Sequence, residues 1–502
     1  MTNYIVNIEV LNKLDRMLRR YSIHSKLELF RKLSHVVDCY LPNDKFLYNL
    51  FPNRTEQFYK SFSKSCHLHE LAYLSLASTV VGEWSGNLKD LNSYEDFRRV
   101  INISKSYNPP FIHANDVGTE KNSMLFFVRT GLQQFIYQDS PISGLYRYWY
   151  LFNNRNEEFN TREIFKNTFK YDFEDYVIFA TGVFILSNVS QHALTEEKII
   201  NELNKSPQFN SEKVKHMIRM LSMDRNTAIE KYNEFKSEDE RMKIYDYNPY
   251  LMKPFLNHDN YLYIPIPLLL FKAITEGFYH YLCYKSIEFR ASFGKFAYES
   301  YIHHLLKSTS YTVIEEFSYY ENKQKFESPD FILVNDNDIV LIEVKANAPS
   351  IALRASDCET YKKELYKAYV KAIEQCIKKE KHIRKGILQY PNLPSKIGRV
   401  SFLAITLEEY HMIDKEQVKE MISEKNLDLK ENYYHIMGTD TLEKVLEKDD
   451  RGIFGYLHDR EDSGTVYRHI ANADINNKGT HEGRSRLLWK KMIDSFASGF
   501  RE

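Results

Sequence analysis

Two short apolar stretches, residues 328–334 and 339–345, are joined by the polar run Asn-Asp-Asn-Asp, and this pattern constrains the fold more than any other. Strong β propensity on both sides of a turn-forming loop predicts an antiparallel hairpin. A turn within that run places Asp330 directly opposite Glu343, and because opposed like charges are destabilising we expect a cation between them. Lys345 shares the face of Glu343, since side chains alternate along a strand. The hairpin therefore predicts a metal site beside an ammonium group, which suits the hydrolysis of phosphate esters.

The residues around these carboxylates follow a pattern of Pro329-Asp330, a spacer of twelve residues, and then Glu343-Val344-Lys345. This pattern resembles the signature of the PD-(D/E)xK, or restriction-endonuclease-like, nuclease superfamily. The resemblance implies catalytic roles for Asp330, Glu343 and Lys345. It also implies that Asp330, Glu343 and the carbonyl of Val344 bind the metal. The alternative is an ordinary surface hairpin with a solvated charge cluster, which explains less well why acidic residues interrupt such apolar runs.

The expected chemistry follows from the charge of a phosphodiester, whose hydrolysis needs a cation on the non-bridging oxygens and an activated water. Two carboxylates are hard oxygen ligands, so we expect Mg²⁺ as the cofactor, with Mn²⁺ as a substitute. A free lysine has a pKa of roughly 10.4 and would need a lowered pKa to act as a base. We therefore expect Lys345 to stabilise charge in the transition state rather than to remove a proton.

The chain before the hairpin agrees with the resemblance. Residues 289–306 have the apolar spacing of an amphipathic helix, and residues 311–314 read as a strand. Members of the superfamily begin their core with such a helix, which often carries an extra acid, and Glu299 matches that role by position. The alternative for Glu299 is an exposed helical glutamate. Glu315 and Glu316, which follow the strand, are weaker candidates for a metal ligand.

The chain after the hairpin continues with a long polar helix over about residues 357–379 and a clear strand over 399–406. Helix, three strands, helix and strand is the core order that the resemblance implies. Lys367, Lys371 and Gln375 are spaced by four, which predicts that they share one helix face. The resemblance implies that Gln375 orients the attacking water or the substrate phosphate. The alternative is a solvent-facing amide.

The charge of the chain is balanced, with 68 basic and 68 acidic residues. Residues 361–400, however, contain nine Lys and two Arg against three Glu, so 11 − 3 gives a local charge of +8. We expect this segment to bind the phosphates of a nucleic acid, although a solvated Lys-rich helix is the alternative. The lysines that we assign to nucleic-acid binding are Lys367, Lys371, Lys378 and Lys379.

A chain of 502 residues exceeds one nuclease core several-fold, so we expect several domains. The predicted fold is an α/β nuclease core, with a mixed central sheet flanked by helices, and a large mainly α-helical N-terminal domain. Residues 1–245 are expected to serve in sensing, recruitment or oligomerisation, and residues 246–284 to form a hairpin and a connecting helix packed on the core. Residues 285–410 are the expected nuclease core, and residues 411–502 a C-terminal α/β extension.

Other patterns limit the location of the protein. No stretch approaches the roughly 20 apolar residues of a membrane span, and the first residues lack the pattern of a signal peptide. The cysteines are scattered without a CxxC pair, which excludes a disulfide framework or a zinc ribbon. They are Cys39, Cys66, Cys283, Cys358 and Cys376. We therefore expect a cytoplasmic protein with no membrane partner.

The expected function is that of a metal-dependent endonuclease, with DNA favoured over RNA. By analogy with restriction and anti-phage defence nucleases that carry helical N-terminal parts, we expect a role in anti-phage defence or DNA processing. The alternative is a nuclease-fold subunit that binds nucleic acid or scaffolds a larger defence complex, with activity or specificity supplied by a partner. Either function is compatible with a homo-oligomer or with a defence-system partner protein. The sequence contains no Walker-type loop.

Overall fold

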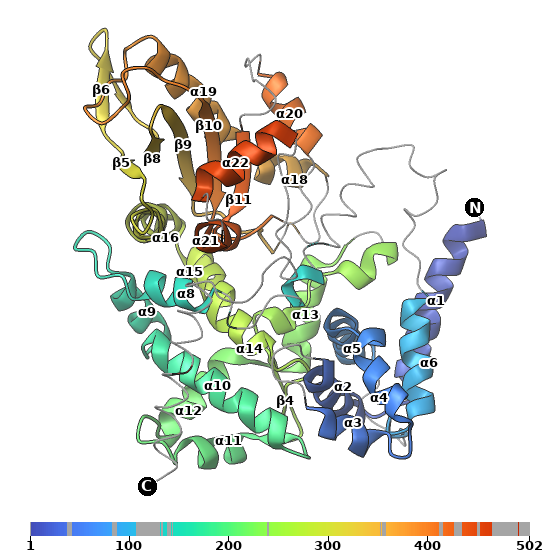
Figure 1. The fold of residues 1–502 in the computed structure, drawn as a ribbon. Helices are drawn as coiled ribbons and strands as arrows, with labels where there is room; N and C mark the ends of the chain where they lie inside the picture. Colours follow the sequence, from blue (N-terminus) through green and yellow to red (C-terminus); the bar gives the residue numbers. More distant parts are fainter. Residues whose placement is uncertain are drawn as a thin grey trace. The chain divides into compact units, whose positions relative to one another are not determined.

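The structure is a computed structural model, and it describes residues 2–37, 43–82, 88–106, 131, 134–137, 142, 144–237, 240–351, 353, 358–410, 415–425, 434–448, 452–463 and 490. The chain divides into two compact units. Unit 1 consists of Met1–Leu145, Phe165–Tyr281 and Leu487–Glu502, and unit 2 consists of Tyr146–Ile164 and Leu282–Arg486. Figure 1 shows unit 1 as mainly helical and unit 2 as a sheet with helices. The predicted helical N-terminal region and the mixture of helix and sheet are therefore confirmed.

Several helices of unit 1 begin at side-chain caps. Thr55, Ser93 and Asp224, for example, each accept a hydrogen bond from a backbone N–H in the first helical turn. The helices are α1 Thr2–Leu18, α2 Ile23–Val37, α3 Asp44–Leu50, α4 Glu56–Ser65, α5 Leu68–Val81, α6 Tyr94–Lys105, η2 Phe135–Tyr137, α10 Phe173–Val189, α11 Glu196–Leu203, α12 Ser211–Leu221, α13 Arg225–Phe235, η3 Glu240–Tyr245, η4 Pro249–Leu251, α14 Leu269–Lys272 and η5 Ala273–Gly277. The buried helices α5 and α10 are apolar on nearly every side, as expected of central core helices.

A small four-stranded sheet in unit 1 corrects one domain boundary. The predicted hairpin after residue 246 exists, as β3 Phe255–His258 and β4 Tyr261–Tyr263, but it belongs to unit 1 and not to unit 2. It pairs instead with β1 Leu194–Thr195 and β2 Ser222–Met223, in the order β1-β4-β3-β2. Strands of two residues are too short to show an alternating pattern, so the sequence does not reveal the partners of the hairpin.

Unit 2 contains a five-stranded mixed sheet in the order β11-β10-β9-β8-β5. The strands are β5 Thr312–Glu315, β8 Phe331–Asn335, β9 Asp338–Lys345, β10 Val400–Thr406 and β11 Tyr434–Gly438. The neighbours of β8 are antiparallel to it, whereas β9, β10 and β11 run parallel. A separate hairpin of β6 Ser318–Glu321 and β7 Gln324–Glu327 is inserted between β5 and β8. The predicted strands β5, β8, β9 and β10 are present in the predicted order, and the β6–β7 hairpin and β11 are additions.

Helices cover both faces of this sheet, which explains why β9 and β10 are almost entirely buried. On β10, the hydroxyl of Thr406 contacts Tyr369 of the long helix, whereas the hydroxyl of Ser401 contacts Glu461 of α22. Positions 401 and 406 differ by an odd number, so these two helices lie on opposite faces. Figure 1 shows α19 and α22 beside the sheet.

The remaining helices are α8 Leu145–Phe152, α9 Thr161–Phe169, α15 Phe278–Lys285, α16 Ile287–Ser292, η6 Phe293–Tyr298, α17 Glu299–Leu306, α18 Cys358–Leu365, η8 Tyr366–Val370, α19 Lys371–Arg384, α20 Lys415–Ser423, α21 Thr439–Lys448 and α22 Gly452–Ser463. Both η6 and η8 are π-helical, so each of the two long helices of unit 2 contains a widened turn.

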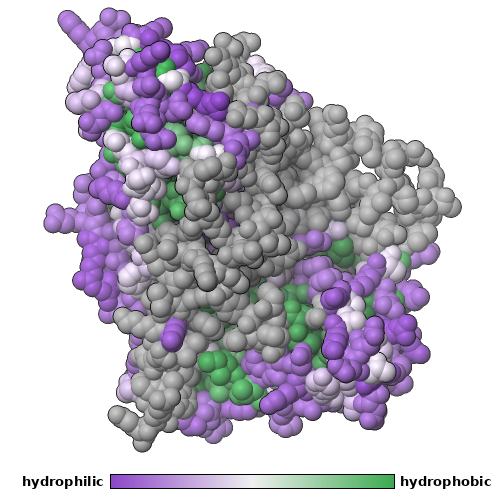
Figure 2. All heavy atoms as spheres, in the orientation of Figure 1, coloured by the Kyte–Doolittle hydropathy of each residue, from purple (hydrophilic) through white to green (hydrophobic). Residues whose placement is uncertain are grey.

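The visible surface of the described residues is mostly hydrophilic, with smaller hydrophobic areas between the hydrophilic ones (Figure 2). Most large apolar side chains are buried, and the exposed exceptions include Tyr284 and Ile287 at the junction of α15 and α16. Across the part of the chain that the structure describes, none of the helices combines the length and apolar content needed to cross a bilayer.

A buried histidine in α2 makes the stability of the fold depend on pH. His35 contacts the Ser187 hydroxyl at 2.9 Å and packs against the rings of Phe46 and Phe184. Burial, together with the nearby charge of Arg31, lowers the pKa of His35 to about 3. The unfolded chain, in which the pKa is near about 6.5, therefore binds a proton at mildly acidic pH that the folded chain does not bind.

We expect the contribution of His35 to stability to be complete above about pH 6.5 and to fall by up to about 1.4 kcal/mol per pH unit as the pH drops toward 3. His35→Gln keeps a hydrogen-bonding group but removes the titration, so its free energy of unfolding should change less between about pH 7 and about pH 5. Urea unfolding at the two pH values measures this. The exposed His192 provides a control, His192→Gln, that should retain the original pH dependence. An unaltered dependence in His35→Gln would contradict the expectation.

Candidate active site

The hairpin that carries the predicted site has the predicted register. Val334 pairs with Ile339, and the ladder continues to Phe331 opposite Ile342. The connection is shorter than the polar run, because the outer two residues of that run pair with each other. Asp336 in the resulting two-residue turn has φ 53°, a left-handed conformation that aspartate tolerates in such turns.

The structure brings together the two carboxylates and the lysine. Asp330 lies one residue before β8, and its Oδ2 accepts a hydrogen bond of 2.6 Å from the backbone N–H of Val344. The Nζ of Lys345 lies 2.8 Å from Oε2 of Glu343 and 3.9 Å from Oδ2 of Asp330. All three predicted residues therefore share one spot at the end of β9.

This spot lies on the face of the sheet that the long helix α18–η8–α19 covers. Glu343 is in register with Ala404, and Lys345 with Thr406, whose hydroxyl contacts that helix. Residues in register on neighbouring strands point to the same face. The Glu343 side chain is only 2% exposed, whereas that of Lys345 is 22% exposed. The site is thus a largely desolvated cluster with its ammonium group closer to solvent.

Burial changes the ionisation of the cluster. It raises the pKa of Glu343 to about 7, with a further contribution from the charge of Asp330. Burial also raises the pKa of Asp330, against the opposing effect of Lys345. For Lys345, burial disfavours the charged form, but the neighbouring Glu343 and Asp330 outweigh it and raise its pKa. Two carboxylates that resist ionisation beside one lysine form a spot where an added cation would be stabilising.

Glu299, predicted from its position alone, lies within electrostatic reach of the cluster. Burial, followed by the charges of Asp330 and Glu316, raises its pKa to about 8. Its helix is held against the end of β9 at Gly294, where an added β-carbon would lie 3.3 Å from that of Ala346. The π-helical turn η6 ends at the residue before Glu299, and such turns are frequent at functional sites.

Glu316 was expected to be a weak candidate, yet it also faces the cluster. Burial, followed by the charge of Asp330, raises its pKa. The β6–β7 hairpin explains its position, because Phe317 and Ser328 at the base of the hairpin hydrogen-bond to each other and hold Glu316 near Asp330. Glu315, the other weak candidate, is exposed and contacts His303 at 3.1 Å instead.

Lys367 and Lys371 are both exposed, whereas Gln375 is half-buried, and the expectation that the three share one helix face stays a prediction. The π-helical turn η8, Tyr366–Val370, contains Lys367 and ends directly before Lys371. Gln375 is one turn before Lys379 on the regular helix α19. Among the described residues its Oε1 is buried without a hydrogen-bond partner.

The lysines assigned to nucleic-acid binding fall into two groups. Lys367, Lys371 and Lys378 are exposed, so they remain available for phosphate contacts. Lys379 is half-buried, and burial lowers its pKa while Glu343 and Glu316 oppose that effect. Its neighbourhood is therefore the carboxylate cluster, and not only solvent as expected of a phosphate-binding lysine.

The donor set fits a magnesium ion. The carboxylates of Asp330 and Glu343 are close to the same lysine, and the carbonyl of Val344 points to the same side of β9 as its N–H, which contacts Asp330. Within the described ranges no group of three or more His, Cys, Asp or Glu side chains is arranged to share one metal. Mg²⁺ is commonly held by only one or two carboxylates together with water and substrate phosphate, so two carboxylates and a carbonyl are sufficient.

The sequence matches no protein-family model, no curated protein and no solved structure. The interpretation of the site therefore depends on the positions and chemistry of its own residues.

Proposed function

We propose that the chain is a metal-dependent nuclease that hydrolyses phosphodiester bonds, with DNA favoured over RNA. The observation that supports this most is the cluster of Asp330, Glu343 and Lys345, in which one ammonium nitrogen lies within 4 Å of two largely buried carboxylates. Burying charges often costs more free energy than the ion pair returns, so a cluster of this kind tends to destabilise the fold. A functional role would explain why the chain carries it. A role in anti-phage defence or DNA processing, in the cytoplasm, is part of the proposal.

In the proposed reaction the residues have distinct tasks. Asp330, Glu343 and the Val344 carbonyl would hold Mg²⁺ or Mn²⁺, which when bound withdraws charge from the phosphate and favours ionisation of water. Lys345 has a raised pKa, so it stays protonated and stabilises negative charge that develops on the phosphate. Glu299, with a pKa of about 8, is mainly protonated at pH 7 and adds little repulsion toward a phosphate.

One observation supports a second candidate, a nuclease-fold subunit that binds nucleic acid or scaffolds a larger complex without cutting. Lys345 already pairs with Glu343 at 2.8 Å, and a paired cluster can be purely structural. The exposed Lys367, Lys371 and Lys378 would serve nucleic-acid binding in either case.

A cleavage assay separates the two candidates. We expect the purified chain to cut supercoiled or linear DNA in Mg²⁺ or Mn²⁺ and to be inactive in EDTA. Without the cation, the buried carboxylates would repel the phosphate of the substrate. Single-stranded DNA and RNA in parallel reactions test the substrate class. If no substrate is cut with either metal, the nuclease proposal fails, and a calorimetric metal titration then shows whether the carboxylates bind a cation without catalysis.

A further inference from the structure

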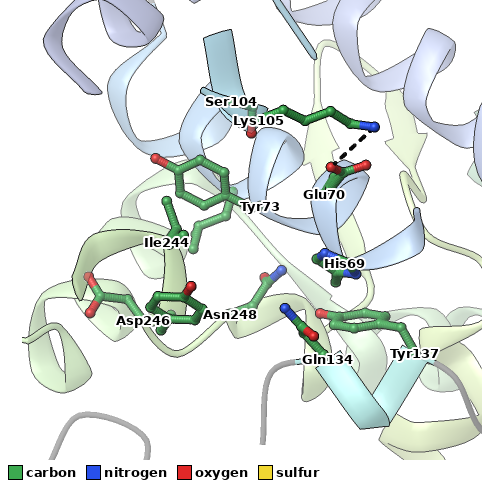
Figure 3. A pocket seen from close by; sticks show the side chains of 12 residues that line it. His69, Glu70, Tyr73, Ser104, Lys105, Gln134, Tyr137, Ile244, Asp246 and Asn248 are labelled. Atoms are coloured by element: carbon green, nitrogen blue, oxygen red, sulfur yellow. Dashed lines mark ion pairs between the residues drawn. The ribbon is translucent and has the colours of Figure 1, made fainter. Parts of the chain in front are cut away.

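Unit 1 contains a cavity of about 220 Å³ that the proposed nuclease reaction does not use. Its walls come from α5, the end of α6, the segment around η3 and residues 134–137. Figure 3 shows its lining side chains, with the ion pair of Glu70 and Lys105 marked. The cavity is smaller than the roughly 300 Å³ at which pockets for drug-sized ligands begin, so its occupant would be a molecule of one or two rings.

The fold holds one side of the cavity rigidly. On α5, His69, Tyr73 and Leu76 follow the spacing of one helix face and line the cavity together. The opposite wall is tied to this helix by Asn248, whose Nδ2 donates to the carbonyl of Ala72 at 3.1 Å. Asp246 in the same wall accepts hydrogen bonds of 2.9 Å from the Tyr232 hydroxyl and the Ser237 N–H. A preformed wall of this kind favours binding, because its side chains lose little conformational entropy when a ligand binds.

Two neutral polar side chains in the lining have unused hydrogen-bonding groups. His69 stacks on His67 at 5.6 Å but makes no hydrogen bond with any other described residue. Burial, followed by the charge of His67, lowers its pKa to about 4, so at pH 7 its ring is neutral and offers one donor and one acceptor. The amide of Gln134 likewise makes no hydrogen bond within the described part of the chain. A ligand can therefore pair with both a ring and an amide.

The rest of the lining suits a flat heteroaromatic molecule without a phosphate. The rings of Tyr73, Tyr137 and Tyr245 line the cavity, and tyrosine rings stack on the faces of nucleobases. Amide and carboxylate groups pair with the edges of bases. The carboxylates of Glu70 and Asp246 outnumber the ammonium of Lys105, which already contacts Glu70 at 3.7 Å and the carbonyl of Ser65. A phosphate in this cavity would meet more negative than positive charge.

We propose that this cavity binds a nucleobase, free or as a nucleoside, between tyrosine rings and with hydrogen bonds to His69 and Gln134. This binding is separate from the nuclease proposal, because all the residues that carry it belong to unit 1 and the carboxylate cluster belongs to unit 2.

Calorimetric titration of the full chain tests the proposal. The probes are adenosine, guanosine, cytidine and uridine, their free bases, and the corresponding nucleoside 5′-monophosphates. We expect at least one nucleoside or base to bind saturably and its 5′-monophosphate to bind at least about tenfold more weakly, because of the excess carboxylates. If none of them binds, or if the monophosphate binds as well as the nucleoside, the proposal is overturned. Heat of binding is measured without cleavage, so the result does not depend on the nuclease proposal.

Two variants locate the binding in the cavity. His69→Ala removes the neutral ring, and Gln134→Leu removes the amide while keeping its size; each should weaken binding of the identified ligand about tenfold or more. Gln134 is only partly buried and makes no hydrogen bond with another described residue, so its variant should fold even if His69→Ala does not. His192→Ala, at an exposed position outside the cavity, is the control and should bind normally. Unchanged binding in folded Gln134→Leu would exclude this cavity as the site.

Discussion

Lys345→Ala is expected to lower the rate of DNA cleavage by about a hundred- to a thousandfold, the usual cost of removing one group that stabilises transition-state charge. The Nζ of Lys345 lies 2.8 Å from Glu343 and 3.9 Å from Asp330, so it is the ammonium that a phosphate would meet beside a metal held by these carboxylates. Single-turnover cleavage in excess Mg²⁺ measures the chemical step directly. The KM for DNA should change less than kcat, because the interaction is strongest in the transition state.

Folding and catalysis must be separated in this experiment. Thermal unfolding followed by circular dichroism shows whether Lys345→Ala is folded, and Glu343→Gln provides an isosteric variant that should also lose cleavage while keeping the fold. Lys307→Ala is the matched control, because Lys307 also pairs with a glutamate, Glu315 at 3.7 Å, but is 62% exposed. Lys307→Ala should cleave at the original rate. A folded Lys345→Ala protein with full activity would rule out the proposed mechanism.

The core of unit 2 could be predicted because its signals are local. The register of β8 and β9 follows from two apolar runs around a polar turn, since a slip by one residue would turn every apolar side chain to the wrong face. Asp330, Glu343 and Lys345 lie on or beside that hairpin, so their proximity followed from the register alone. The order of helices and strands followed in the same way, from periodicity within each segment.

Other parts of the site depend on features without a local signal. The turn of the β6–β7 hairpin uses Asn322 and Lys323, both with positive φ, where glycine would have marked it more clearly. The sequence pattern therefore does not predict this hairpin or the position of Glu316 beside it. The π-helical turn η8 has no signal in the sequence either, because a wider turn does not change the residue composition of the helix.

A buried arginine in unit 2 shows a third kind of feature that local patterns miss. Arg147 in α8 is only 3% exposed, and its Nε lies 2.8 Å from Oε1 of Glu443. Its other nitrogens lie 3.3 Å from Glu408 and 3.7 Å from Asp440. The hydroxyl of Tyr301 donates to Glu443 at 2.8 Å. The pKa of Arg147 is raised because these carboxylates outweigh the effect of its burial, so the guanidinium stays charged and joins elements almost 300 residues apart in the chain.

Arg147→Ala is expected to lower the free energy of unfolding by about 3–5 kcal/mol, because it leaves Glu443 and Glu408 buried without their cation. Denaturant unfolding followed by circular dichroism measures the loss. Arg155→Ala removes an exposed arginine from the same unit and should change stability by less than about 0.5 kcal/mol. The double variant Arg147→Ala/Glu443→Ala should lose less stability than the sum of its two single variants, since each single change leaves a buried charge that the double change removes. If Arg147→Ala unfolds at the same denaturant concentration as Arg155→Ala, this buried ion cluster does not stabilise unit 2.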